Sequence, residues 1–169
     1  ILSLKHNFKN LELTSFIRYR LSKRSSLSFE YSLYNTPPGL LQIQPFQNIT
    51  NPLHIIIGNP SLKHYSTHGV YIKYNVFNLQ KETGLNTYLI VNFMKDQIVA
   101  KSIIDENFIR YTTYANVSGG YNARGKVSYS KNIKIDAFKS LKYEFELSTI
   151  IDKQINFNND QQYASINTL

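Results

Sequence analysis

The sequence predicts an all-β fold whose antiparallel strands follow one another as an up-and-down meander. Three observations predict it. The 169 residues include 13 Tyr and 10 Phe but no Cys or Trp, and aromatic and β-branched residues favour strands. Apolar and polar residues alternate with a period of two in segment after segment, the pattern of a strand with one apolar face. The connections between these segments are of two kinds, short and long.

The alternation marks each strand in turn. In the second strand Leu27, Phe29 and Leu33 share one face, while serines and Glu30 share the other. In the fifth strand, Phe108–Ser130, the alternation persists for longer than the roughly five or six residues of a typical strand. We therefore expect one long strand that glycine bends at Gly119-Gly120. No helical window is apparent, and the polar residues after Asp152 are not predicted to be strand. The predicted strands are Leu11–Leu21, Ser26–Tyr34, Tyr65–Phe77, Leu85–Ala100, Phe108–Ser130 and Leu141–Ile151.

Two architectures fit this pattern equally well. Long strands with one apolar and one polar face are typical of transmembrane β-barrels, in which closure leaves no unpaired edge in lipid. A soluble β-sandwich or lipocalin-like barrel alternates in the same way. Apolar runs are only a few residues long, so no transmembrane helix is expected.

The long connection after the second strand carries the most specific motifs. They are Tyr31-Ser32, Pro37-Pro38, Gln44-Pro45-Phe46, Asn51-Pro52-Leu53 and Gly58-Asn59-Pro60-Ser61-Leu62-Lys63. This series resembles the C-terminal barrel region of TonB-dependent receptor-like outer-membrane proteins of the Bacteroidota. The segment from Tyr114 to Val117, followed by Gly125, is similar to a later strand of that barrel. The chain departs from the family pattern at His64, where proline is usual, and before Pro37, where Arg-Pro is frequent.

The resemblance implies energised uptake of a scarce nutrient across the cell outer membrane. It implies that residues 1–169 are a fragment of a single outer-membrane β-barrel domain, roughly six or seven of about 22 strands, with the plug domain and remaining strands absent. The implied partners are outer-membrane lipids and lipopolysaccharide, TonB through the missing N-terminal region, and an unknown small nutrient. The long loop is expected outside the cell, and the short turns at Ser22, Asn78 and around Lys131 in the periplasm.

Two Asn-Pro steps enclose a short apolar run within that long loop. Pro52 and Pro60 lack a backbone N–H and restrict the residues before them, so they prevent Leu53–Ile57 from extending into a barrel strand. Gly58 permits a turn that other residues resist. We therefore expect a short, structured extracellular segment here.

The expected role of the chain is binding, not catalysis. No Ser-His-Asp, phosphate-binding-loop or dinucleotide motif is present, and no cofactor is expected. His64 and His68 would be about 13 Å apart in a strand, so no metal site is expected. Glu144 and Glu146 are expected to line a polar lumen or to pair with basic residues. The candidate ligand-binding residues are Asn35, Phe46, Asn51, His54, Asn59 and His64 in the loop and Asn116, Asn122 and Arg124 in the lumen.

The charge and the tyrosines bear on the surroundings of the protein. The net charge is +8, but Lys and Arg are scattered, so no nucleic-acid partner is expected. Tyrosines near strand ends favour membrane interfaces, and six are expected to form aromatic girdles. A passive barrel and a soluble all-β binding or adhesin-like domain are the alternatives, and the soluble domain would cover the apolar face with protein. The six tyrosines are Tyr19, Tyr31, Tyr34, Tyr65, Tyr74 and Tyr129.

Overall fold

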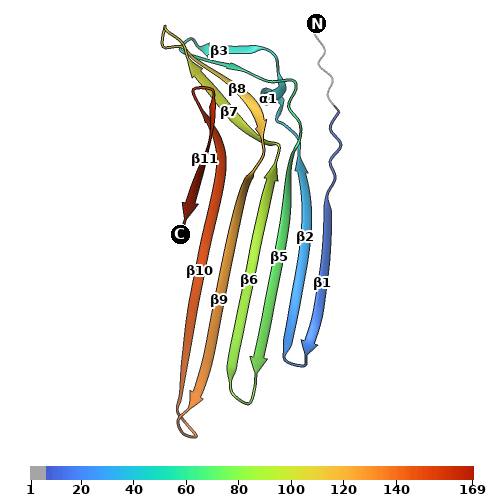
Figure 1. The fold of residues 1–169 in the computed structure, drawn as a ribbon, viewed down its shortest axis with the longest axis vertical. Helices are drawn as coiled ribbons and strands as arrows, with labels where there is room; N and C mark the ends of the chain where they lie inside the picture. Colours follow the sequence, from blue (N-terminus) through green and yellow to red (C-terminus); the bar gives the residue numbers. More distant parts are fainter. Residues whose placement is uncertain (1–6) are drawn as a thin grey trace.

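The computed structural model describes residues 7–169 as two sheets, one of long strands and a smaller one at its end (Figure 1). In spatial order the large sheet contains β1 (Leu13–Ser22), β2 (Ser25–Thr36), β5 (Tyr65–Asn78), β6 (Thr83–Lys95), β9 (Gly120–Lys134), β10 (Ser140–Asn158) and β11 (Gln161–Thr168). The small sheet contains β3 (Gln47–Asn51), β4 (His54–Ile57), β8 (Arg110–Val117) and β7 (Gln97–Ile104). We call the small sheet, together with the short helix α1 (Leu40–Ile43), the cap.

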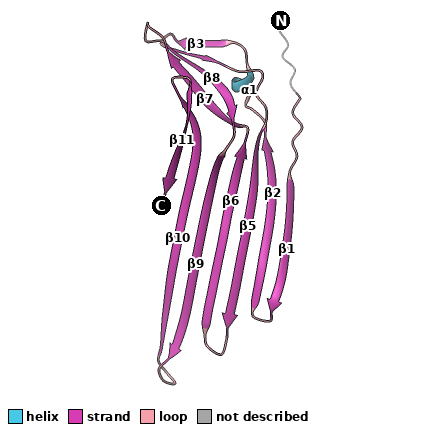
Figure 2. Ribbon diagram, in the orientation of Figure 1, coloured by secondary structure: helices cyan, strands magenta, loops and turns pink. Residues whose placement is uncertain are grey.

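The large sheet is the predicted meander. All of its neighbouring strands are antiparallel, and their spatial order follows the chain once the cap strands are passed over. The short turns β1–β2, β5–β6 and β9–β10 lie at the end opposite the cap (Figure 2). The sheet is open, with β1 and β11 as its edges. The all-β class, the order of the strands and their directions are confirmed.

Two predicted long strands are each broken where the cap begins. Asp96, with φ 55°, separates β6 from β7, and Gly119, with φ 100°, separates β8 from β9. The pairing register is the same before and after these breaks. Met94 pairs with Gly120, and Gln97 pairs with Val117, so each strand advances by three residues between the two pairs. The bend predicted at Gly119-Gly120 is confirmed, but the predicted strands 85–100 and 108–130 are each interrupted where their hairpin bends into the cap.

The C-terminal region contains more strand than the sequence predicts. β10 continues to Asn158, and a turn with positive φ at Asn159 (44°) and Asp160 (72°) leads into β11. Consecutive Asn and Asp tolerate the positive φ angles that a two-residue hairpin turn requires. The turn expected around Lys131 also lies later, because β9 runs to Lys134.

The apolar residues gather on one face of the large sheet, and protein does not cover that face. Cross-strand partners continue the same rows, for example Ile17 opposite Phe29 and Val127 opposite Leu147. Ile17 is 61% exposed and Leu147 is 63% exposed. In the described residues no large side chain is completely buried, and the buried apolar residues are only Ile43, Leu62, Val117 and Ile155. A soluble domain would bury this face in a shared core.

The short strand β4 forms where the two Asn-Pro steps confine it. The Oδ1 of Asn51 accepts a hydrogen bond from Leu53 N at 3.0 Å, and the Oδ1 of Asn59 accepts one from Ser61 N at 3.0 Å. The structured loop segment is thus confirmed. The reason for Gly58 is different from the predicted one: its φ is not positive, but a Cβ there would lie 2.7 Å from Gln44 N. Glycine is needed for close approach of two backbones.

Candidate functional site: the polar face and the cap

Polar side chains form continuous rows across the second face of the large sheet. Residues opposite one another on neighbouring strands share a face, so the register defines each row. From the turn end toward the cap, the first two rows are Arg20-Ser26-Asn75-Asn86-Ser128-Glu146 and Arg18-Ser28-Lys73-Tyr88-Lys126-Ser148. The next two rows are Phe16-Glu30-Tyr71-Ile90-Arg124-Ile150 and Ser32-Gly69-Asn92-Asn122-Asp152.

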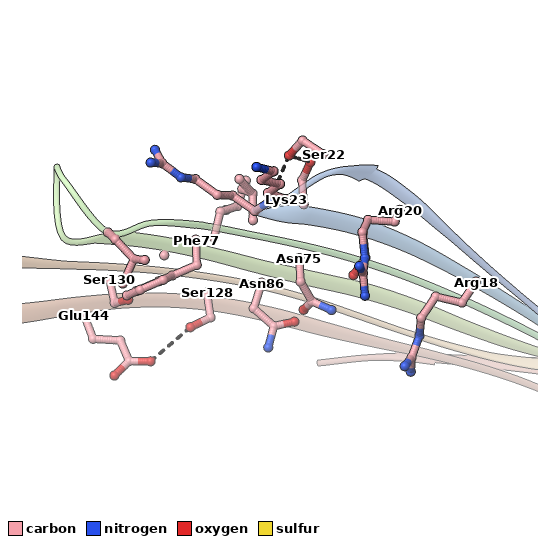
Figure 3. Close-up of a pocket in the computed structure, with 17 residues that line it drawn as sticks. Arg18, Arg20, Ser22, Lys23, Asn75, Phe77, Asn86, Ser128, Ser130 and Glu144 are labelled. Atoms are coloured by element: carbon pink, nitrogen blue, oxygen red, sulfur yellow. Dashed lines mark hydrogen bonds between the residues drawn. The ribbon is translucent and has the colours of Figure 1, made fainter.

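A hollow of about 750 Å³ lies on this polar face near the turn end. Arg18 and Arg20 of β1 project to the same side of the sheet as Asn75, Asn86 and Glu144 (Figure 3). Hydroxyl, amide and guanidinium groups dominate its lining, so the hollow offers many hydrogen-bond donors to a ligand.

Charges on the two sides of the hollow differ in whether they are paired. On the β9–β10 side, Lys126 Nζ lies 2.7 Å from Glu146 Oε1, and Ser128 Oγ donates to Glu144 Oε1 at 3.0 Å. On the β1 side, Arg18 Nε donates to Ser28 Oγ at 3.4 Å, and Arg20 takes part in no ion pair with any described residue. The polar face is therefore cationic toward β1 and locally neutralised toward β10.

Amides and tyrosines occupy the rows nearer the cap. Asn92 Nδ2 donates to Asn122 Oδ1 at 2.9 Å. Gly69, in the same row, leaves the room that Asn92 uses, because a Cβ there would lie 3.0 Å from Asn92 Oδ1. The rings of Tyr71 and Tyr88 lie side by side with centroids 6.4 Å apart.

Two asparagines join the loop between β2 and β5 to the bent hairpin. Asn59 Nδ2 donates to Tyr114 O at 2.8 Å. The Oδ1 of Asn116 accepts from Lys63 N at 2.8 Å, and its Nδ2 donates to Lys63 O at 3.1 Å and to Asp96 O at 2.7 Å. These bonds hold the cap against the bend.

Further polar contacts run through the cap itself. His54 Nε2 and Thr112 Oγ1 are 3.0 Å apart, and Ser102 Oγ lies 2.8 Å from Thr112 Oγ1. Lys101 of β7 forms an ion pair with Asp160 in the β10–β11 turn and lies 5.5 Å from the ring centroid of Phe157. The cap is thus tied to the large sheet at the bend and at β10.

Comparison with known proteins identifies the family of the chain. The chain matches the outer membrane protein beta-barrel family over residues 5–169. The chain belongs to this family. Its exposed apolar face is therefore the lipid face of a barrel wall in the cell outer membrane, and its polar face is the lumen face. No match was found among curated proteins or among solved structures.

Within 7–169 no helix has both the length and the apolar character to cross a membrane. The same stretch contains no cluster of three or more His, Cys, Asp or Glu side chains arranged to hold a metal ion.

The lipid face of this barrel wall has aromatic residues at two levels. On β9 the outward residues run from Tyr121 through Ala123, Gly125 and Val127 to Tyr129. Eight residues cover about 26 Å along a strand, and the strand tilt shortens this toward the roughly 25 Å apolar band of outer-membrane barrels.

Four of the six tyrosines predicted for the girdles lie on the lipid face. They are Tyr19, Tyr31, Tyr74 and Tyr129. The prediction is wrong for Tyr34 and Tyr65, which the alternation places on the opposite face. Tyr65 accepts a hydrogen bond from Thr67 Oγ1 at 2.8 Å.

The predicted ligand-binding residues separate into two places. Asn122 and Arg124 lie on the lumen face as expected, but Asn116 does not, because the chain bends into the cap at Gly119. Asn59, His54 and Asn51 already make hydrogen bonds within the cap. Their ligand contacts, and those of all nine candidates, remain predictions.

The other candidate ligand-binding residues of the loop are Phe46, His64 and Asn35. Phe46 is 56% exposed just before β3, and His64 is half-buried just before β5. Asn35 has a buried Oδ1 without a hydrogen-bond partner among the described residues. Sequence reasoning missed Arg18 and Arg20, although the loose alternation of the first strand already placed both opposite its apolar residues.

Replacing Asn116 is expected to detach the loop from the bend. Asn116→Ala removes three hydrogen bonds to backbone groups of Lys63 and Asp96, and a typical hydrogen bond contributes about 0.5–1.5 kcal/mol. Asn116→Asp should be at least as harmful, because a carboxylate would face the Lys63 and Asp96 carbonyls. Amide hydrogen exchange at residues 59–65 should accelerate in both variants. Asn48→Ala, whose side chain accepts hydrogen bonds from Thr50 of the same strand, is the control, and unchanged exchange in both Asn116 variants would contradict the assigned role.

The β5–β6 turn, at the end of the sheet opposite the cap, carries a pH-dependent clamp. Hydrogen bonding to Lys134, and then to Asn132, holds the pKa of Glu82 below its ordinary value of 4.5. The clamp is therefore fully present above pH 4.5 and is lost as pH falls through the lower folded value. Exchange of the 79–82 amides, compared with Glu82→Gln at each pH, should be slower in the parent protein at neutral pH and equal in strong acid. A constant difference would contradict the clamp.

Proposed function

We propose that this chain is part of the barrel wall and extracellular loops of a TonB-dependent receptor that takes up a scarce nutrient, of the type found in Bacteroidota. The motifs of the β2–β5 loop support this proposal through their resemblance to such receptors. The proposed role is binding and passage of a ligand, not catalysis. TonB, engaged through another region of the receptor, is the proposed energy-coupling partner.

The cap is the observation that carries the proposal. Two loops that enter it from separate places in the chain join through β4 and β8, which pair in parallel from His54 opposite Arg110 to Ile56 opposite Thr112. Asn59 and Asn116 then fix the joined loops above the wall. A pore for passive diffusion does not need ordered extracellular loops, whereas a receptor needs them to capture a ligand.

Lipids are the other proposed partners. Lys153 Nζ lies 5.9 Å from the ring centroid of Tyr121 at the cap end of the lipid face. A cation beside an interfacial aromatic ring suits the anionic groups of lipopolysaccharide.

Energy dependence tests the proposal against a passive barrel. Cells that express the complete protein, cells with its gene deleted, and expressing cells treated with a protonophore would be compared for compounds removed from the medium. Energised uptake predicts a compound that is removed only by untreated expressing cells. Removal that persists with the protonophore would make the protein a passive barrel.

A further inference from the structure

We propose that the hollow on the lumen face binds ligands with at least two oxyanion groups, carboxylates or phosphates, through Arg18 and Arg20. The inference names a ligand class for the proposed receptor. It rests on the proposed function in one respect, namely that the ligand passes through the lumen. Three features support it: the shape of the hollow, the spacing of the two arginines, and the lack of an ion-pair partner for them among the described residues.

The spacing of the two arginines suits a ligand with two anionic groups. Both project from β1 to the hollow side of the sheet (Figure 3). Residues two apart in a strand have Cα atoms about 7 Å apart. A guanidinium is a planar fork that binds one carboxylate or phosphate through two parallel hydrogen bonds. Two such forks can therefore hold the two ends of a small polyvalent anion.

The neighbouring strands add hydrogen-bond donors beside the two arginines, and the carboxylate of Glu30, in the next row of β2, forms no ion pair with a described residue. Ser28 and Ser26 face the two arginines on β2, and Lys73 and Asn75 follow them on β5. Hydroxyl, amide and ammonium groups all donate hydrogen bonds to oxyanions. Lys73 lies in the row of Arg18 on the lumen face, next to the residues that line the hollow.

No described carboxylate neutralises the two arginines. The ion pairs within residues 7–169 join Lys101 to Asp160, Lys126 to Glu146 and Lys134 to Glu82. The one carboxylate that lines the hollow belongs to Glu144 and accepts a hydrogen bond from Ser128, three strands beyond β2 in the sheet. The charge of Arg18 and Arg20 is thus available to an anion that enters the lumen.

Chemical protection of the arginines tests the site in the parent protein. The complete protein in detergent would be treated with phenylglyoxal, which modifies guanidinium groups, and the modified peptides would be quantified by mass spectrometry. Citrate and pyrophosphate are the probes, with sucrose and sodium chloride of equal ionic strength as controls for crowding and screening. We expect slower modification of Arg18 and Arg20 with one or both anions, while Arg110 in the cap reacts at an unchanged rate.

Each outcome has a defined meaning. Protection by citrate alone assigns carboxylate ligands, and protection by pyrophosphate alone assigns phosphate ligands. Arginines that are unreactive before any probe is added would mean that a protein carboxylate already pairs with them, and the proposal would fail. Equal rates with the anions and with sodium chloride would also overturn it.

A variant series supplies a second measurement. Calorimetric affinity for the protecting anion should fall about tenfold in Arg18→Gln/Arg20→Gln, since charge-assisted hydrogen bonds are lost. Arg18→Lys/Arg20→Lys should be intermediate, and Arg110→Gln should match the parent protein. Unchanged affinity in the double glutamine variant would contradict the site. Neither measurement needs an energy source, so failure of energised uptake and failure of anion binding are separately visible.

Discussion

Gly58→Ala is expected to unfold the cap and leave the barrel wall intact. The new Cβ would lie 2.7 Å from Gln44 N and 2.9 Å from Gln42 O, and closer still to Gln44 O. These are backbone atoms, so no rotamer change can relieve the clash. Overpacking a site typically costs 1–3 kcal/mol, and we expect about 3 kcal/mol here because the Asn59 N to Gln42 O hydrogen bond of 2.6 Å must lengthen as well.

Protease sensitivity measures this effect in the membrane-embedded protein. Outer-membrane vesicles with the Gly58→Ala variant should be cleaved within residues 36–64 at protease concentrations that leave the parent protein whole. Gly39→Ala is the matched control, because its Cβ would lie 3.6 Å from Gln42 Oε1, an ordinary contact distance. The heat resistance of the barrel on electrophoresis should stay the same in both. A Gly58→Ala cap as resistant as the Gly39→Ala cap would contradict the close-packing account.

Strand positions were predictable because lipid and water act on every residue of the wall. The alternation of apolar and polar residues in β2, β5 and β6 identifies the two faces of the sheet directly. The sequence of short and long connections gives the directions of the strands. The break at Asp96 was not predictable, since it depends on one left-handed residue and on contacts from Asn116. β11 was missed because its partners are Ile151 to Asn158, largely above the level of Tyr121, where no lipid requires an apolar face.

The candidate site was predictable in region but not in detail. The motif block around Asn59 marked the loop that builds the cap, and Asn122 and Arg124 were placed on the lumen face by parity alone. The roles of Asn59 and Asn116 were not visible, because their partners lie far away in the sequence, at Tyr114 and Lys63. Sequence patterns give the face of a residue, whereas hydrogen-bond partners depend on how the two loops meet.

A lysine at Leu89 should destabilise the barrel far more than a lysine at the next residue. Leu89 lies midway along the outward series from Leu85 to Phe93 and is 43% exposed. A charged residue near the middle of the lipid face costs about 2–4 kcal/mol. Ile90 lies on the lumen face beside Arg124, where water solvates a new charge and the repulsion between exposed charges costs at most about 1 kcal/mol.

Urea titration of the complete protein in phospholipid vesicles can separate the two faces. Leu89→Lys should lose at least about 1 kcal/mol more than Ile90→Lys, although both change an apolar residue to the same cation in the same strand. Because the substitutions are adjacent, strand propensity and position along the barrel nearly cancel, and the difference reports the surroundings of each side chain. Equal losses would mean that the exposed apolar face of the large sheet does not meet lipid, since a charge placed in lipid must cost more than the same charge placed in a water-filled lumen.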